Sequence, residues 1–252
     1  MKIATWNVNS LKVRLPHLLD WAAANQPDVI CLQEIKCEDA AFPGPALLDA
    51  GYQAVFSGQK TYNGVAILAR HALTDVAVGI PGLEDEQRRV IAATVGDVRV
   101  VCGYFPNGQA PGTDKFAYKL RWLEALTAYL KEELVRYPSL VLGGDYNIAP
   151  DERDAHPDWK EEIHVSPPER EAFRTLIGLG LTDAFRLFEQ PERVYSWWDY
   201  RMFAYRRNFG LRIDHLLVSQ PLVPQVRGCH VDKTPRALER PSDHAPVVVE
   251  LA

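Results

Sequence analysis

Long apolar runs are missing from this sequence of 252 residues. No segment reaches the roughly 18 consecutive apolar residues of a membrane-spanning helix, so no membrane partner is expected. The first residues, Met1–Asn9, lack the apolar stretch and the small-residue cleavage site of a secretion signal. They have the pattern of a strand that begins at once, and the expectation is a cytoplasmic protein.

Cysteine is scarce, and its spacing argues against one kind of metal site. The cysteines are Cys31, Cys37, Cys102 and Cys229, and no two of them form a CxxC pair. A zinc site built from thiolates would need closer spacing. Cys31 and Cys102 lie in apolar runs, so we expect buried, reduced thiols.

Several short catalytic motifs are absent as well. The chain has no GxSxG nucleophile motif, no Walker loop and no GxGxxG fingerprint. Gly143-Gly144 lacks the Lys and Ser or Thr that complete a phosphate loop. The net charge of −5 gives no general basic character, but a local basic patch is sufficient for nucleic-acid binding.

The sequence does contain a regular mixture of strand and helix patterns. Apolar residues make up 47% and charged residues 24%, an ordinary balance for a globular protein. Apolar runs typical of buried strands occur at Lys2–Trp6, Val29–Leu32, Gly64–Leu68, Val98–Tyr104, Leu140–Leu142, Ile213–Val218 and Val247–Leu251. Helical spacing occurs over Arg14–Asn25, Lys115–Tyr137 and Pro168–Leu179. We predict one α/β domain over residues 1–252, with two packed sheets and outer helices in four layers.

Polar residues follow or precede six of these apolar runs. They are Asn7 and Asn9, Gln33 and Glu34, Tyr104 and Asn107, Asp145 and Asn147, Asp214 and His215, and Asp243 and His244. Turn formation alone explains any one of them. Six strands that end in this way favour a common site, because loops at strand ends can present functional groups from a rigid scaffold.

The chemistry of these residues suits a phosphoester. Carboxylate and amide oxygens are ligands for Mg²⁺ or Mn²⁺. A metal ion held by Glu34 would polarise a phosphate and stabilise the leaving oxygen. Asp145 could take a proton from water. His244, oriented by Asp243, and Asn147 could stabilise the charge on the phosphate oxygens.

Seven segments follow one another along the chain: Thr5–Ser10 (TWNVNS), Leu32–Lys36 (LQEIK), Gly103–Gly108 (GYFPNG), Gly143–Pro150 (GGDYNIAP), Tyr195–Arg201 (YSWWDYR), Gly210–Ser219 (GLRIDHLLVS) and Arg240–Val247 (RPSDHAPV). In this order they resemble the exonuclease III family of bacterial DNA-repair nucleases, relatives of the abasic-site endonucleases. The resemblance implies the endonuclease/exonuclease/phosphatase fold, shared with deoxyribonuclease I and the inositol phosphatases. It also implies hydrolysis that depends on Mg²⁺ or Mn²⁺ and leaves a 3′-hydroxyl end. The expected partner is double-stranded DNA with abasic sites or blocked 3′ ends, bound by a monomer.

The resemblance assigns roles to individual residues. It implies catalysis by Tyr104, Asp145, Asn147, Asp214, Asp243 and His244. It implies a metal site among Asn7, Glu34, Asp145, Asn147, Asp243 and His244, with Glu34 as the principal ligand. The roles of Asp145 and Asp214 exchange between one-metal and two-metal mechanisms. Asp243 is expected to hold His244.

The resemblance also implies contacts with DNA. Trp197, Leu211 and Ile213 match the family's apolar pocket for a sugar that lacks its base, and Trp198 lies in the same segment. Further contacts are expected from Lys36, Lys60, Asn63, Asn107, His164, Arg201, Arg206, Arg207 and Arg212. Several of these side chains could equally be solvated surface groups, and Arg206 and Arg207 are favoured because they lie close to the pocket segment.

Two histidines depart from the family pattern. His164 stands where abasic endonucleases carry a small residue, and an imidazole there could narrow the space for an abasic sugar. Two hypotheses stay open: the enzyme favours 3′ ends over internal abasic sites, or His164 points to solvent. His215 follows Asp214, and strand alternation turns it to the opposite face, where it would pack or bind the backbone.

Two other functions compete with this prediction. One is an enzyme of the same fold acting on an inositol phosphate or a sphingolipid, but GYFPNG, YSWWDYR and GLRID favour DNA. The other is a non-catalytic DNA-binding relative. Such a protein would lose its carboxylates first, because buried charge without a metal is costly. Here Glu34, Asp145, Asp214 and Asp243 are all present.

Overall fold

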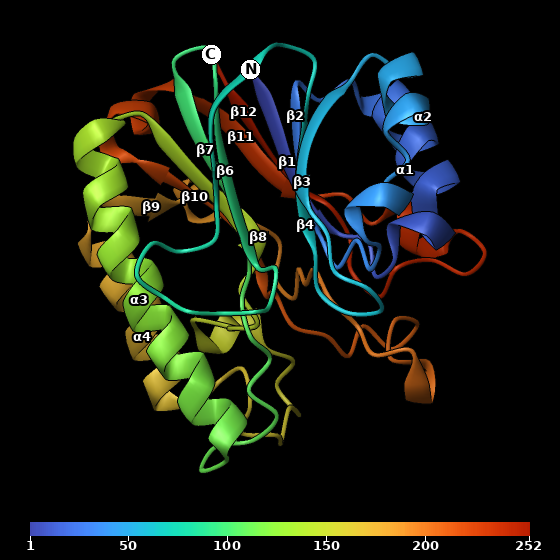
Figure 1. Cartoon of the computed structure of the whole chain (residues 1–252). Helices are drawn as coiled ribbons and strands as arrows, with labels where there is room; N and C mark the ends of the chain where they lie inside the picture. Colours follow the sequence, from blue (N-terminus) through green and yellow to red (C-terminus); the bar gives the residue numbers. More distant parts are fainter.

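Two six-stranded β-sheets pack face to face in the computed structural model, which describes residues 1–252 (Figure 1). The first sheet has the order β11-β12-β1-β2-β4-β3, formed by β1 (Lys2–Asn7), β2 (Val29–Gln33), β3 (Gln53–Ser57), β4 (Val65–Ala69), β11 (Val226–Val231) and β12 (Val247–Leu251). The second has the order β5-β6-β7-β8-β10-β9, formed by β5 (Leu73–Val78), β6 (Val90–Val95), β7 (Val98–Tyr104), β8 (Leu140–Asp145), β9 (Leu181–Asp183) and β10 (Asp214–Ser219).

Helices cover the outer face of each sheet and complete the four predicted layers (Figure 1). Helices α1 (Leu11–Asn25) and α2 (Gly44–Asp49) lie on the first sheet, and α3 (Asp114–Arg136) and α4 (Pro167–Gly178) lie on the second. Short 3₁₀ helices occupy the connections: Asp39–Ala41, Glu152–Asp154, Ala184–Leu187, Arg201–Phe203, Gln220–Gln225 and Thr234–Ala237. No helix combines the length and the apolar character needed to cross a membrane.

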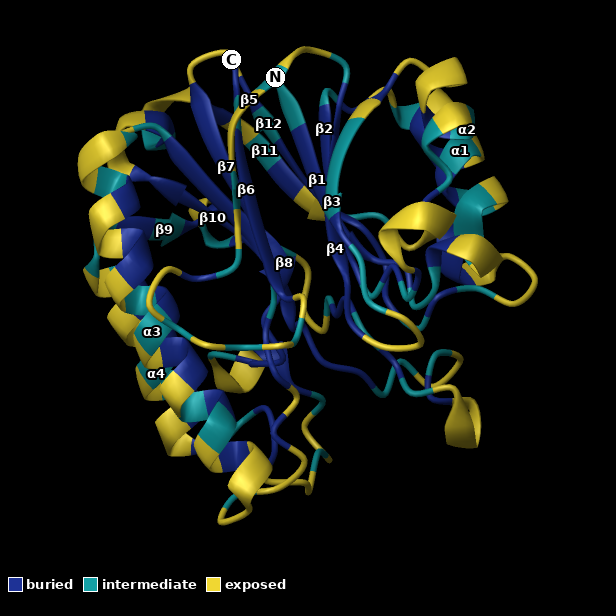
Figure 2. Ribbon diagram, in the orientation of Figure 1, coloured by how far each residue is buried: buried dark blue, intermediate teal, exposed yellow.

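The central strands are apolar on both faces because each sheet has a core on both sides (Figure 2). Along β2, Cys31 belongs to the cluster between the sheets, whereas Ile30 and Leu32 pack beneath α1. On the second sheet, Leu142 of β8 packs with Leu126 of α3. This double burial explains why the central strands read as continuous apolar runs. All four cysteines are buried and free, as expected.

All seven predicted strands and all three predicted helices are present, with ends shifted by a few residues. Helix α1 begins earlier than predicted, at Leu11. The elements missed are β3, β5, β6, β9, β11 and α2. Strands β5 and β11 were not predicted because each is largely exposed and has no continuous apolar run.

The first and last strands are neighbours. Strand β1 pairs in parallel with β2 and antiparallel with β12, and Lys2 lies opposite Glu250. The amino group of Met1 donates a hydrogen bond to the carbonyl of Leu251 at 2.8 Å. The N- and C-termini therefore lie side by side at the same end of the molecule (Figure 1).

Candidate active site

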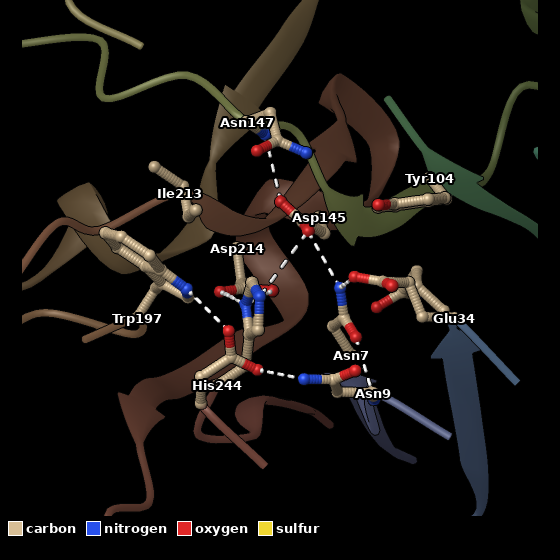
Figure 3. Close-up of polar contacts among 12 residues, drawn as sticks. Asn7, Asn9, Glu34, Tyr104, Asp145, Asn147, Trp197, Ile213, Asp214 and His244 are labelled. Carbon is tan, nitrogen blue, oxygen red and sulfur yellow. Dashed lines mark hydrogen bonds and ion pairs between the residues drawn. The ribbon is translucent and has the colours of Figure 1, made fainter. Parts of the chain in front are cut away.

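Strand direction brings the predicted polar residues to one edge of the double sheet. β1 and β2 are parallel, as are β7 and β8, so their carboxyl ends lie at the same edge. β10 runs antiparallel to β8 and β12 runs antiparallel to β1, so the starts of these two strands reach that edge. Figure 3 shows the resulting cluster, drawn from both sheets: Asn7, Glu34, Tyr104, Asp145, Asn147, Asp214 and His244.

Asn7 joins the two carboxylates at the centre of the cluster. Its Nδ2 donates hydrogen bonds to Glu34 Oε1 and to Asp145 Oδ2, each at 2.9 Å. Its Oδ1 accepts from the backbone N–H of Asn9 at 3.0 Å. Asn7 thus lies beside Glu34 as expected, but it presents its amide NH₂ rather than its carbonyl to the carboxylates.

Asp145 lies in surroundings that favour its neutral form. Burial, the largest influence, raises the pKa of Asp145 to about 7; the His244 cation opposes this shift, whereas the Asp214 and Glu34 carboxylates add to it. The backbone N–H of Asn147 donates to Asp145 Oδ1 at 3.0 Å and fixes the carboxylate. A carboxylate whose pKa lies near neutrality is suited to accept a proton.

His244 is held by Asp214 and not by Asp243, which corrects the prediction. Its Nδ1 donates to Asp214, 2.9 Å from Oδ2 and 3.1 Å from Oδ1. Its Nε2 lies 3.7 Å from Asp145 Oδ2. Burial disfavours the charged ring, but Asp214, Asp145 and Asp243 together raise the pKa of His244 to about 10. The side chain is therefore an imidazolium at neutral pH and can donate a hydrogen bond to an anion.

Asp243 instead connects two other parts of the site. Its carboxylate accepts from Asn9 Nδ2 and from Trp197 Nε1, both at 2.9 Å. The loop before β12 is turned so that consecutive residues, Asp243 and His244, reach different partners. Asp243 consequently fixes the indole of Trp197 beside the catalytic cluster.

A divalent cation fits the centre of this cluster. Glu34, Asp145 and His244 have ligand atoms that all lie within 4.8 Å of one another. Glu34 Oε1 and Asp145 Oδ2 converge on one neutral amide, and two hard oxygen donors so placed suit a hard divalent ion. We expect the two carboxylates to hold the ion, because oxygen donors suit Mg²⁺ or Mn²⁺ better than an imidazole nitrogen does.

Two further predicted metal ligands point elsewhere. Asn147 donates its Nδ2 to the carbonyl of Phe105 at 3.0 Å, and its Oδ1 accepts from Asn107 Nδ2 at 3.4 Å. Asp243 is occupied by Asn9 and Trp197. Asp243 does not belong to the group of acidic and histidine side chains whose ligand atoms lie close enough together to hold the ion.

Tyr104 lies at the end of β7 and faces the carboxylates (Figure 3). Burial raises the pKa of its phenol well above the usual value, and the charges of Glu34 and Asp145 add to the shift. The Arg89 guanidinium lies over the ring, 4.8 Å from its centroid. Tyr104 is thus a neutral hydroxyl donor beside the two carboxylates.

The structure separates the predicted DNA-binding residues into exposed and buried groups. Exposed residues are Lys60, Asn107, Arg201, Arg206 and Arg207. Lys36 is half-buried, with its Nζ 2.8 Å from Glu34 Oε2. Asn63 is buried, and its amide donates to Gln59 at 3.0 Å.

Arg212 and Trp198 are wrong as predicted DNA contacts. Arg212 is 1% exposed and forms ion pairs with Asp154 and Asp183, each at 2.7 Å. Trp198 is fully buried, and its indole N–H donates to Asn208 at 3.1 Å. Both are structural residues whose polar groups are satisfied inside the protein.

The predicted apolar pocket is a closed cluster in this structure. Leu211 has no exposed surface, and Ile213 is 2% exposed. Leu211 pairs through its backbone with Trp197, which is the partly exposed member. Leu211 therefore offers no surface for the predicted DNA contact, and Trp197 is the member of the predicted pocket with exposed surface.

The two unusual histidines both lie inside the protein. His164 is buried, which excludes the hypothesis that it points to solvent. Its Nδ1 donates to the carbonyl of Asn147 at 2.7 Å, and its ring centroid lies 6.5 Å from that of Trp197. His215 binds the carbonyl of Ile148 through Nε2 at 2.9 Å, which confirms that it turns to the backbone on the opposite face.

Sequence reasoning missed Ser196, which supports Asp214. Its hydroxyl donates to Asp214 Oδ2 at 2.6 Å and accepts from the backbone N–H groups of Ile213 and Asp214. The only signal was its place in the YSWWDYR segment. Arg89 was missed too, because it lies in a loop outside every recognised segment.

Comparison with known proteins agrees with this geometry. The endonuclease/exonuclease/phosphatase family pattern matches residues 4–244. Exodeoxyribonuclease III of Haemophilus influenzae is 37% identical, over 99% of this chain and 99% of its own length. A 3′ phosphatase from Neisseria, solved with a product DNA hairpin, has a TM-score of 0.98 and 49% identity over 100% of this chain and 99% of its own. An AP endonuclease from Archaeoglobus fulgidus has a TM-score of 0.95 and 37% identity, with the same two coverages. The chain therefore belongs to the endonuclease/exonuclease/phosphatase family, as a metal-dependent nuclease of the exonuclease III type.

Proposed function

We propose that this nuclease acts on double-stranded DNA as a monomer, with Mg²⁺ or Mn²⁺, and prefers 3′ ends to internal abasic sites. The arrangement that carries the hydrolytic function is the pair of linked groups Glu34–Asn7–Asp145 and Asp214–His244. It places two oxygen ligands, a proton acceptor and a cation within a few ångströms of one another. These are the groups that hydrolysis of a charged phosphodiester requires.

Each side chain has a distinct part in the proposed reaction. The bound ion would be held by Glu34 and Asp145, and it supplies charge neutralisation at the phosphate and at the leaving oxygen. Asp145 orients the attacking water and accepts its proton. His244, kept charged by Asp214, donates to a phosphate oxygen. Tyr104 donates its hydroxyl to another.

Asn107 and Asn147 complete the phosphate site in this proposal. Their amides are joined by the bond from Asn107 Nδ2 to Asn147 Oδ1, so they form one polar edge beside Asp145. Each amide has two N–H groups, and Asn147 uses one of them on Phe105. The remaining donors are available to phosphate oxygens.

His164 carries the proposed preference for 3′ ends. The imidazole is fixed between Asn147 and Trp197, and burial lowers its pKa to about 3, so it is a rigid neutral ring. A flipped abasic sugar would need space beside Trp197, whereas a 3′-terminal phosphate needs only the phosphate site. The similarity to a Neisseria 3′ phosphatase supports this choice over the more distant AP endonuclease.

A substrate panel tests the proposal. Wild type and His164→Gly would be assayed on duplexes with an internal abasic analogue, a recessed 3′ end or a nicked 3′ phosphate, with Mg²⁺, Mn²⁺ or EDTA. We expect the substitution to raise abasic incision relative to 3′-phosphate removal, and EDTA to abolish both. His71→Gly, at an exposed position, is the control. An unchanged ratio in His164→Gly would refute the role of the imidazole, and cleavage in EDTA would refute the metal site.

A further inference from the structure

A buried lysine lies directly behind the two asparagines. Lys119, in the first half of α3, has no exposed surface. Its Nζ donates to the carbonyl of Asn147 at 2.7 Å, to the carbonyl of Asn107 at 3.2 Å and to the carboxylate of Glu169. One ammonium group therefore joins the loop after β7, the loop after β8 and helix α4.

Lys119 fixes the main chain at the residues whose side chains face the phosphate in the proposed function. Asn147 is held on its other sides by Asp145 and Phe105, and its carbonyl accepts from both Lys119 and His164. Asn107 lies in an exposed loop and has fewer supports. The ammonium sets the separation of the two carbonyls, and with it the spacing of the two amides.

The loop around Asn107 packs closely against the side chain of Lys119. Gly108 has φ +89°, and a Cβ atom there would lie 2.9 Å from Lys119 Cδ. Only glycine combines this backbone conformation with so close an approach to the lysine stem. The position of the loop therefore depends on the position of the Lys119 side chain.

Glu169 neutralises the ammonium and extends its connections. Its carboxylate accepts from the backbone N–H groups of His164 and Ser166, each at 3.1 Å, and from the Ser166 hydroxyl at 2.6 Å. Burial of a charged pair is expensive, and an apolar pair of similar size often stabilises a protein equally well. The chain has a second such pair, Arg99–Glu133, which contacts none of the site residues.

We propose that Lys119 is a positioning residue, which acts through the backbones of Asn107 and Asn147 to hold their amides at the spacing of two phosphate oxygens. The inference rests on the proposed roles of those asparagines. Displacing groups in an active site by about 1 Å can slow catalysis ~100-fold. The lysine does not reach the phosphate itself, because the backbone of the two loops lies in between.

The test removes the ammonium while the protein stays folded. Lys119→Met alone leaves the buried Glu169 carboxylate without its cation. The double variant Lys119→Met/Glu169→Gln is therefore made as well, so that both members of the pair are neutral. Arg99→Met/Glu133→Gln is the matched control, a buried ion pair neutralised in the same way. Activity is measured on a nicked 3′-phosphate duplex below the melting temperature of each variant. NMR spectra of protein that carries ¹⁵N-labelled asparagine report the resonances of the side-chain amides.

We expect kcat to fall ~10–100-fold in both Lys119 variants and to change less than ~3-fold in the control. The amide resonances of Asn107 and Asn147 should shift in the Lys119 variants only. When Lys119→Met is added to Asn107→Ala/Asn147→Ala, kcat should fall by less than a further ~3-fold. The reason is that the effects of residues that act as a unit are not additive.

Three results would overturn the inference. One is wild-type kcat in folded Lys119 variants. The second is a multiplicative loss in the triple variant, which would show that Lys119 does not act through the asparagines. The third is full activity in Asn107→Ala/Asn147→Ala, which would refute the proposed phosphate site together with the inference.

Discussion

The Nδ1 of His244 lies 2.9 Å from Asp214 Oδ2, and this contact joins the loop before β12 to the start of β10 in the second sheet. The Asp214 carboxylate in turn accepts from the Ser196 hydroxyl, which fixes its orientation. The imidazolium of the active site is therefore stabilised by a carboxylate distant in sequence, although Asp243 is its immediate neighbour in the chain.

Removing the Asp214 charge should lower the pKa of His244. We expect Asp214→Asn to bring it from about 10 to near or below neutrality, since burial is then less opposed. Activity at neutral pH should fall ~10²–10⁴-fold, as in other enzymes that lose the carboxylate behind a histidine. Asp243→Asn is the comparison, and NMR titration of the metal-free protein gives both pKa values. Equal shifts in the two variants would contradict the assignment.

Removing the Glu34 carboxylate should weaken metal binding. Calorimetric titration with Mn²⁺ in the absence of DNA should show more than ~10-fold lower affinity for Glu34→Gln, because one of two hard oxygen ligands loses its charge. Glu38→Gln changes an exposed carboxylate nearby and should bind like wild type. If Glu34→Gln bound Mn²⁺ with wild-type affinity, Glu34 would not be a ligand of the metal ion.

Arg212 and Arg206 should behave in opposite ways. Arg212→Met leaves Asp154 and Asp183 short of their buried partner, and we expect the free energy of unfolding to fall by ~3–5 kcal/mol in urea titrations. Arg206→Gln changes an exposed side chain and should leave stability intact. It should reduce by about one the slope of DNA affinity against salt concentration. If instead Arg212→Met kept its stability and reduced the slope of DNA affinity against salt concentration, Arg212 would be a phosphate contact.

His215 should make the protein less stable in acid. Burial and the neighbouring Arg212 lower its pKa from 6.5 to about 4, so between these values the unfolded chain binds more protons than the native state. The stabilisation is complete above pH 6.5 and is lost as the pH falls to about 4, with a total near ~3 kcal/mol. His215→Gln should lack this component. Urea titrations at pH 7 and pH 4 measure it, and parallel losses in both proteins would exclude it.

The sequence predicted the layers and the location of the site for a clear physical reason. Strands buried on both faces leave long apolar runs, and the polar residue after each run marks the common edge of the sheets. Asn7, Glu34 and Asp145 were found in this way. Edge strands such as β5 leave no such run, because one face meets water.

Pairing and burial within the site could not be predicted. Whether Asp214 or Asp243 holds His244 depends on the turn of the backbone before β12, which no spacing reveals. Arg212 is of a residue type that often contacts DNA. It is buried instead, because it forms ion pairs with Asp154 and Asp183, which lie far from it in sequence. Lys119 lies in the first half of an amphipathic helix, where a lysine ordinarily faces solvent.

The pairing of β1 with β12 has a consequence for how the enzyme comes into being. During synthesis Asn7 and Glu34 emerge early, but His244 and the strand beside β1 follow only at the other end of the chain. Contacts between such distant segments form late and slowly in folding. The complete set of catalytic groups therefore requires that β12 has paired with β1.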